Sequence, residues 1–232
     1  MRVVILQPSY IPWRGYFHQI ALADIFVYYD DVKYDRNGWR NRNTIKTPKG
    51  LQWLTIPVLT PSLETEKTPI NQIAIDPTKK WAPKHLNTLR ANYARAPFFS
   101  TYFPQLEEVL TEPHHLLVDL TIRLTNMIAN WLDLGSTRFM RSSEFQHLNG
   151  SKTDRLINIL KYLNADEYIT GPSAAAYLEQ DKFVHSGIKL TYMVYDYPPY
   201  PQLYPPYEPQ VSIIDLLFMT GTDAMSYIIP RR

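Results

Sequence analysis

"RVVILQPSYIPWRGYFHQIALADIFVYYDD" (residues 2–31) determines the fold class. Its first five residues form a short β-branched apolar run, which is typical of a buried strand. Pro8 lacks a backbone donor and disfavours helix at the residue before it, so a loop follows the strand. Residues 15–23 then suit a short helix, and "DIFVYYDDVKY" suits a second buried strand. Strand, loop, helix and strand in this order predict a βαβ unit with a parallel sheet.

The rest of the chain extends this unit. Thr47-Pro48-Lys49-Gly50 lies between two alternating segments and predicts an antiparallel hairpin. Further strands are expected within residues 166–173 and 188–197. We therefore predict one α/β domain over residues 1–232, with a mostly parallel sheet in a Rossmann-like or nucleotidyltransferase-like core. It carries the β-hairpin and a mainly helical insertion around residues 80–135.

Composition excludes several classes of protein. The net charge of +2, from 24 basic and 22 acidic residues, is too balanced to indicate general nucleic-acid or membrane-surface binding, and no DNA partner is predicted. The absence of cysteine excludes disulfides, a thiolate nucleophile and a cysteine zinc site. His114-His115 has no third spaced ligand, so no metal is predicted. No run reaches the length of about 20 apolar residues that a membrane helix needs, and we predict a cytoplasmic protein without membrane insertion.

Aromatic residues and proline are abundant. The chain has 17 tyrosines, 5 tryptophans and 19 prolines. Tyrosine offers a flat apolar face with a polar tip, which suits sugars, nucleobases and interfaces, although much of it fills cores. Residues 197–209, "YPPYPQLYPPYEP", contain six of the prolines and predict a folded loop or lid.

The first strand-to-helix loop is the expected ligand site, because open α/β sheets bind ligands at the carboxyl ends of their strands. It has neither of the usual glycine-rich phosphate-binding motifs. It offers aromatic and hydrogen-bonding side chains instead: Gln7, Ser9, Tyr10, Trp13, Arg14, Gly15, Tyr16 and His18. A glycine at the start of the following helix would expose backbone amides to an anion.

Carboxylates and a histidine are the candidate proton acceptors. Asp30 and Asp31 end the second strand, where only one of them can face the cleft. That aspartate is either a general base or amine anchor, or a partner in a turn or in a salt bridge with Arg40 or Arg42. His85 is the best candidate base outside the first loop, with a packed core or surface role as the alternative.

"GWRNRNTIKTPKG" (residues 38–50) combines arginines with asparagines. Arginine grips phosphate or carboxylate at two points. Arg40 and Arg42 would share one strand face about 7 Å apart and could span a phosphate or diphosphate, with Lys46 nearby. The alternative is a solvated hairpin face. The opposite face would carry Trp39, Asn41 and Asn43. Ser173, after Gly171 in a Gly-Pro-Ser turn, is a further candidate anion contact.

Nearly the whole chain resembles the WbqC-like protein family. The motifs that carry the resemblance are Q-P-x-Y-x-P-W-x-G-Y-F (residues 7–17), W-x-N-R-N-x-I-K (39–46) and S-I-I-D-L-L-F (212–218). Two positions depart from it: Leu6 replaces a histidine that many members carry before Gln-Pro, and Met219 replaces a common asparagine. A catalytic role of that histidine would leave this chain inactive or working differently.

The resemblance implies a role in decorating an amino sugar, in bacterial O-antigen, other surface polysaccharides or natural products. Its motif positions become the expected site: Gln7, Tyr10, Trp13, Gly15, Tyr16, Asp30, Trp39, Asn41, Arg42, Asn43 and Lys46. Weaker additions are Gly171, Tyr200, Gln202 and Asp215, the last of which also has an explanation in helix capping.

The resulting hypothesis is an acyl- or aminoacyl-transferase that forms an amide on a nucleotide-linked amino sugar. The arginines would hold a phosphate of the sugar nucleotide or of the donor, and Asp30 or His85 would accept the amine proton. Gln7 and Asn41 would stabilise the carbonyl oxygen. Acyl-CoA and aminoacyl-tRNA are the candidate donors, so tRNA is a candidate partner, and no cofactor is identified beyond them. The alternatives are an ATP-using nucleotidyltransferase-like ligase and a non-catalytic nucleotide-sugar- or glycan-binding protein.

Overall fold

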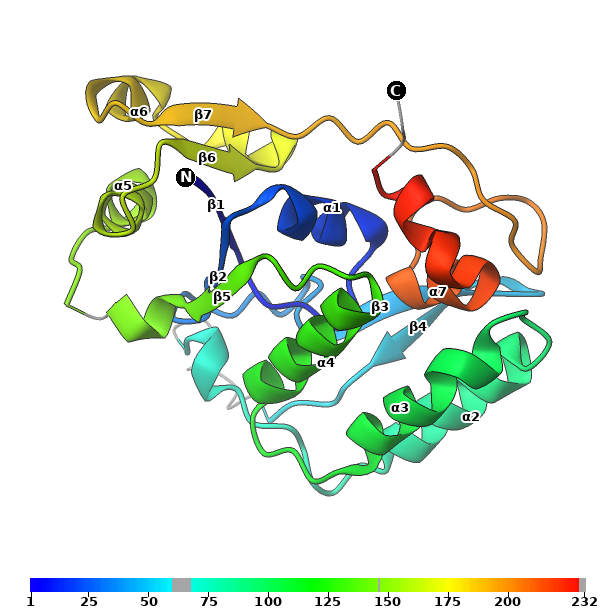
Figure 1. Cartoon of the computed structure of the whole chain (residues 1–232). Helices are drawn as coiled ribbons and strands as arrows, with labels where there is room; N and C mark the ends of the chain where they lie inside the picture. The colour runs from blue at the N-terminus through cyan, green and yellow to red at the C-terminus, as the bar shows by residue number, and fades with distance from the viewer. Residues whose placement is uncertain (60–67, 146, 230–232) are drawn as a thin grey trace.

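The computed structural model describes residues 1–59, 68–145 and 147–229 (Figure 1). Its five-stranded sheet is parallel throughout and has the order β5-β2-β1-β6-β7. The strands are β1 (Arg2–Leu6), β2 (Ile25–Tyr28), β5 (Arg138–Arg141), β6 (Glu167–Thr170) and β7 (Lys189–Tyr192). The βαβ unit predicted from the first 31 residues is confirmed, because β1 pairs with β2 in parallel and α1 (Arg14–Leu22) connects them.

The order of the strands reverses beside β1. The chain runs from β1 to β2 and then to β5 on one side, and it returns to the other side of β1 for β6 and β7. Val3 pairs with Ile25 of β2 and with Tyr168 of β6, so β1 is central. Open α/β sheets bind ligands outside the carboxyl ends of the strands where such a reversal occurs.

The helices cover the sheet and the hairpin in two groups (Figure 1). The smaller apolar core lies between the sheet and α5 and α6, and the larger core joins the opposite side to the hairpin and the remaining helices. The remaining helices are α2 (Trp81–Tyr93), α3 (Phe99–Thr111), α4 (Leu117–Trp131), α5 (Lys152–Tyr162), α6 (Gln180–His185) and α7 (Ile213–Thr220). Short 3-10 helices are η1 (Ile70–Gln72), η2 (Ser142–Phe145), η3 (Pro172–Ala176) and η4 (Gly221–Tyr227). In the described part of the chain, every helix is too short or too polar to span a bilayer.

The predicted hairpin is present as β3 (Arg42–Thr47) and β4 (Gly50–Thr55). Thr47 pairs with Gly50, whose φ of 101° is a conformation that glycine adopts without strain. The strand begins only at Arg42, however, so Arg40 lies in the bend before it. Side chains from Asn43 to Thr47 are buried on both faces because α7 and the first loop pack against the hairpin. The simple alternation of one buried and one solvated face therefore does not apply.

The tyrosine- and proline-rich segment is folded against α1. Arg14 is buried and donates to the carbonyl oxygen of Pro198 at 2.9 Å, to that of Tyr227 at 3.2 Å and to the hydroxyl of Tyr207 at 2.8 Å. Its guanidinium carbon also lies 4.6 Å from the centre of the Tyr197 ring. One arginine thus fixes several points of this segment beside the start of α1.

Candidate functional site

A cavity of about 1180 Å³ opens at the carboxyl ends of β1 and β6, where the strand order reverses. We call it the larger compartment. Gln7 follows β1 and Gly171 follows β6, and both line it. Other walls are aromatic: Trp13, Tyr16, Tyr29, Tyr177 and Tyr195. Its charged lining residues are Asp35, Arg40 and Lys152. This mixture of rings, amides and a few charges is typical of a site for a polar small molecule.

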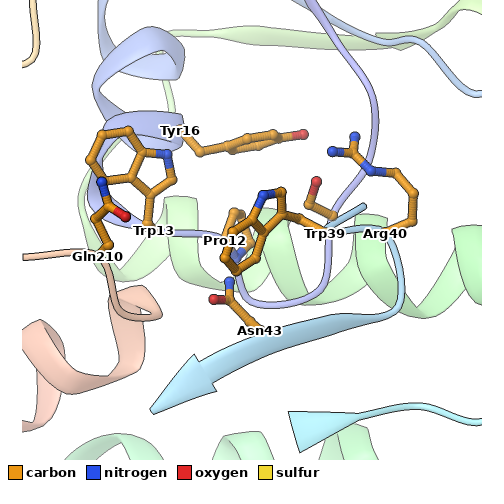
Figure 2. A pocket seen from close by; sticks show the side chains of 8 residues that line it. Pro12, Trp13, Tyr16, Trp39, Arg40, Asn43 and Gln210 are labelled. Carbon is orange, nitrogen blue, oxygen red and sulfur yellow. The ribbon is translucent and has the colours of Figure 1, made fainter. Parts of the chain in front are cut away.

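A second cavity of about 330 Å³ adjoins the first and is called the smaller compartment (Figure 2). The two share Ser9, Trp13, Tyr16 and Arg40. The smaller compartment adds Pro12 and Gln210, together with Trp39 and Asn43 from the motif at the start of the hairpin. The four shared residues make the two cavities neighbours, with Arg40 on the wall of both.

Gly15 is required by the position of Trp13. A Cβ atom at residue 15 would lie 2.3 Å from Cζ2 of the indole. The indole cannot easily move away, because the rings of Tyr195 and Tyr197 pack edge-on against it at centroid distances of 5.0 and 6.0 Å. Glycine at this motif position therefore lets the indole lie over the first turn of α1, where it lines both compartments.

The asparagines of the hairpin motif hold backbone in place. Nδ2 of Asn43 donates to the carbonyl oxygens of Tyr10 at 3.1 Å and Ile11 at 2.8 Å, and Ser212 Oγ donates to the same Ile11 oxygen at 2.7 Å. Ile11 has a φ of 35°, which costs a β-branched residue on the order of 1–3 kcal/mol and persists only under such constraint. Asn41 Nδ2 likewise donates to the Ile56 carbonyl oxygen at 2.8 Å. The bonds from Asn43 and Ser212 fix the loop whose residues Ser9 and Pro12 line the smaller compartment.

Arg40 is the cation that faces both compartments. Its Nη1 donates to the carbonyl oxygen of Gln7 at 3.2 Å, and Tyr16 Oη donates to the same oxygen at 3.2 Å. No carboxylate of the described residues forms a salt bridge with it, and its buried Nε has no hydrogen-bond partner. Burial lowers the pKa of the Arg40 guanidinium, an effect that Tyr16 and Asp35 oppose. A cation partly removed from water without an ion pair favours an anionic ligand.

Arg42 does not join Arg40. Its guanidinium lies 4.7 Å from the centre of the Trp53 ring and donates to the carbonyl oxygen of Asn37, and it lines neither compartment. The two side chains diverge because the strand that would place them on one face starts at Arg42. The structure thus does not bring together the expected two-arginine clamp, and Arg40 alone faces the site.

Asp30 is enclosed by hydrogen bonds. It is fully buried and accepts from Arg141 Nε at 2.7 Å, from Ser142 Oγ at 3.1 Å, and from the backbone and hydroxyl of Ser143, both at 2.9 Å. It lines neither compartment. Its ion-pair partner is therefore Arg141, and its carboxylate joins the end of β2 to the segment after β5. This geometry offers no oxygen to a substrate amine.

His85 also lies in the core, against Tyr10. Since a carbonyl oxygen only accepts, the 3.2 Å contact with Thr55 assigns the proton to Nε2 of His85, and Nδ1 accepts from the Tyr10 hydroxyl at 3.0 Å. Both side chains are buried, and neither lines a compartment. Burial lowers the pKa of His85 to about 4, so the ring is neutral at physiological pH. We assign both residues structural roles.

The buried His85 predicts a loss of stability in acid. The pKa of about 4 in the folded state lies below the ordinary value of 6.5, so the unfolded chain takes up the proton first as the pH falls. The contribution of neutral His85 to the free energy of unfolding is complete above pH 6.5, and it declines by about 3 kcal/mol as the pH falls to 4. Urea unfolding at pH 7 and pH 4 measures this decline. Between these pH values the free energy of unfolding should fall by about 3 kcal/mol more for the wild type than for His85→Gln. Equal losses would contradict a neutral, buried histidine.

Four expected site residues meet in a buried network instead. Asp215 Oδ2 accepts from the Tyr93 hydroxyl at 2.7 Å, and Asp215 Oδ1 accepts from Gln202 Nε2 at 2.9 Å. The same Gln202 nitrogen donates to the Tyr200 hydroxyl at 3.2 Å. Lys46 Nζ donates to the carbonyl oxygen of Pro206. Burial raises the pKa of the Asp215 carboxyl, and hydrogen bonds from Tyr93, Tyr200 and Gln202 oppose that shift. The network attaches the tyrosine- and proline-rich segment to α7 and the hairpin.

The other expected residues divide between the site and its surroundings. Gln7, Gly171 and Ser173 line the larger compartment. His18 does not, and its Nδ1 contacts the Tyr197 hydroxyl at 2.9 Å. Polar lining residues that the sequence did not single out are Gln19, Tyr29, Asp35, Lys152, Tyr168, Thr170, Tyr177, Tyr195 and Gln210. Tyr29 could have been found, since it lies at the carboxyl end of a predicted strand, whereas Lys152 and Gln210 come from distant segments without a local signal. Among the described residues, no group of three or more His, Asp and Glu could hold a metal ion.

A model of the WbqC-like protein family matches residues 7–227. The chain is 42% identical over 229 residues to Rv1507c of Mycobacterium tuberculosis (strain ATCC 25618 / H37Rv), described as an uncharacterized protein. That similarity covers 98% of this chain and 97% of the mycobacterial protein. No solved structure matches the chain.

Proposed function

This chain belongs to the WbqC-like protein family, and on that premise we propose that it is an amide-forming transferase acting on a nucleotide-linked amino sugar. It attaches an acyl or aminoacyl group to the sugar amine, in the synthesis of bacterial surface polysaccharide or a related natural product. The observation that carries the proposal is Arg40, a guanidinium without a carboxylate partner among the described residues, on the wall of both ring-lined compartments.

The lining supports a sugar nucleotide as ligand. Arg40 would hold a phosphate, and the rings of Trp13 and Tyr16, which line both compartments, suit a sugar and a base. Two compartments that meet at one cation can also hold two reactants in a fixed relation, which removes much of the entropy cost of a bimolecular step. Acyl-CoA or aminoacyl-tRNA would then be the activated donor.

Asp35 is the carboxylate that lines the larger compartment, and we assign it the role that Asp30 cannot take. The backbone amide of Asn37 donates to its Oδ1 at 3.0 Å and orients it. The amine lone pair forms the new bond to the donor's carbonyl carbon, and the bond from that carbon to the donor's sulfur or oxygen breaks with its electron pair. Asp35 accepts the proton lost by the amine, and the leaving group is protonated by solvent. Gln7 lines the same space, and its side-chain amide would stabilise the carbonyl oxygen.

An assay of product formation tests the proposal. UDP- and dTDP-linked amino sugars are incubated with the protein and with acyl-CoA or aminoacyl-tRNA, and the amide is detected by mass spectrometry. Asp35→Asn should lower kcat about 100-fold, within the range typical of a lost general base, and leave the affinity for the sugar nucleotide within threefold. Product that requires ATP and releases pyrophosphate would show a ligase instead. A product-forming Asp35→Asn variant with unchanged kcat would contradict the role of this carboxylate.

One observation favours a binding protein as the second candidate. No histidine is among the described residues that line either compartment, and Leu6 lines the larger one at the position where the resemblance leads one to expect histidine. A tight sugar-nucleotide complex without product for any donor in the same assay would establish a binding protein and exclude the transferase.

A further inference from the structure

We propose that the smaller compartment is a nucleobase subsite, which places the base beside Trp39, the phosphates on Arg40 and the sugar in the larger compartment. This assignment rests on the proposed function, because it takes a nucleotide as the ligand. The residues of the smaller compartment would then distinguish a nucleotide from a bare phosphate.

The smaller compartment has the walls that a flat ring needs. Figure 2 shows the rings of Trp13 and Trp39 facing a common space, with Tyr16 above and Pro12 behind. Its volume of about 330 Å³ lies at the lower end of the usual range for small-molecule sites. Its charged lining residue is Arg40, at the junction with the larger compartment. A neutral base therefore suits this side of the arginine.

Trp39 has a partly exposed ring that stacks on a second tryptophan. Its side chain is 46% exposed although it stacks on Trp53, with ring centroids 5.3 Å apart and planes inclined by 30°. The guanidinium of Arg42 in turn lies over Trp53. Stacking on Trp53 thus supports an indole that leaves much of its surface accessible, and such preorganisation lowers the entropy cost of binding a base. Stacking of a base on an aromatic side chain contributes about 1–3 kcal/mol.

Gln210 supplies a polar edge to the same space. The Gln210 carbonyl oxygen accepts from Thr44 Oγ1 at 3.2 Å, and its backbone amide donates to Glu208 Oε1 at 3.1 Å. Its backbone is thereby fixed, whereas its side-chain amide forms no hydrogen bond with the described residues. A planar amide with donors and an acceptor can pair with the edge of a base at two points.

The division of charge sets the direction of the ligand. Arg40 lines both compartments, so a diphosphate bound to it can carry a base in the smaller compartment and a sugar in the larger one. The larger compartment carries Asp35 and Lys152 among amides and hydroxyls, and this polar lining suits a sugar. The uncharged rings and amides on the other side of Arg40 suit the base. The same ring-binding subsite could accept the uracil or thymine of a sugar nucleotide or the adenine of an acyl-CoA or tRNA donor.

Binding of UDP, ADP and inorganic diphosphate to the full chain, measured by isothermal titration calorimetry, tests the subsite. A nucleoside diphosphate should bind at least tenfold tighter than inorganic diphosphate. Trp39→Ala should remove that difference and leave the affinity for diphosphate within twofold, while Trp39→Phe retains most of it. Tyr162→Ala is the matched control, because this ring is 53% exposed and lines neither compartment. A preference for UDP assigns the base to the sugar nucleotide, and a preference for ADP assigns it to the donor.

Three results would overturn the subsite: no measurable binding of any of these ligands, equal affinities for nucleoside diphosphates and diphosphate, or a Trp39→Ala variant that weakens both equally. These measurements involve no turnover. A Trp39-dependent preference without amide product would leave the subsite intact and refute the transferase. Amide product without that preference would do the reverse.

Discussion

Replacing Arg40 by methionine is expected to weaken the binding of a sugar nucleotide about 100-fold. Methionine retains an apolar stem of similar length and removes the guanidinium that faces both compartments. Each hydrogen bond from a charged donor is worth about 1.5–3 kcal/mol, so the loss of two to a phosphate costs about 3 kcal/mol. At about 1.4 kcal/mol per factor of ten, this corresponds to roughly 100-fold or more in the dissociation constant, which calorimetry can measure.

Arg42→Met is the matched control, since it removes the same group two residues away. Arg42 contacts Trp53 and the Asn37 backbone rather than either compartment, so its replacement should change affinity by less than threefold. Arg40→Lys should recover only part of the affinity, because lysine keeps the charge but lacks the planar two-point donor. Equal losses for the Arg40→Met and Arg42→Met variants would support a clamp of two arginines and contradict the divergence of these side chains. Thermal unfolding of each variant separates binding effects from loss of folding.

The sheet and the location of the site could be predicted because both follow from local patterns. A buried run, a loop that starts at Pro8, a helix and another buried run specify adjacent parallel strands, and β1 and β2 pair as expected. The rule that ligands bind at the carboxyl ends of such strands then selects the segment after Leu6, where the larger compartment opens. The reversal beside β6 could not be predicted, because the sequence gives no order for distant strands.

The roles of individual polar residues were less predictable, since a role depends on long-range contacts. Asn43 resembles a ligand contact in the sequence, and in the structure its amide holds the strained backbone of Ile11 in the loop that lines the site. His85 has the right chemistry for a base, but it packs against Tyr10 in the core. Arg40 and Arg42 alternate in sequence, yet the strand that would align them starts too late. Gln210 reaches the site from a segment 170 residues after Arg40, so no local pattern could associate the two.

Asp30→Asn is expected to destabilise the protein by about 3 kcal/mol. Asp30 is fully buried, and asparagine would replace one of its two accepting oxygens by a donor. In place of Oδ2 that donor would face Arg141 Nε and the Ser143 hydroxyl, and in place of Oδ1 it would face the Ser142 hydroxyl and the backbone amide of Ser143. Removing one partner of a buried ion pair costs about 3–5 kcal/mol, and the lower end applies here because the Arg141 side chain remains 33% exposed to water. Urea unfolding at pH 7 measures the change.

Asp35→Asn provides the contrast that decides between the two carboxylates. Asp35 is exposed and lines the larger compartment, so its replacement should alter the free energy of unfolding by less than about 0.5 kcal/mol, as is usual for surface substitutions. It should lower kcat about 100-fold, whereas Asp30→Asn should keep the turnover of its folded fraction. An Asp30→Asn variant that unfolds like the wild type and binds sugar nucleotide normally, yet forms no product, would return the general-base role to Asp30. In that event the hydrogen bonds from Ser142, Ser143 and Arg141 would have to open during the reaction, because they occupy both carboxylate oxygens.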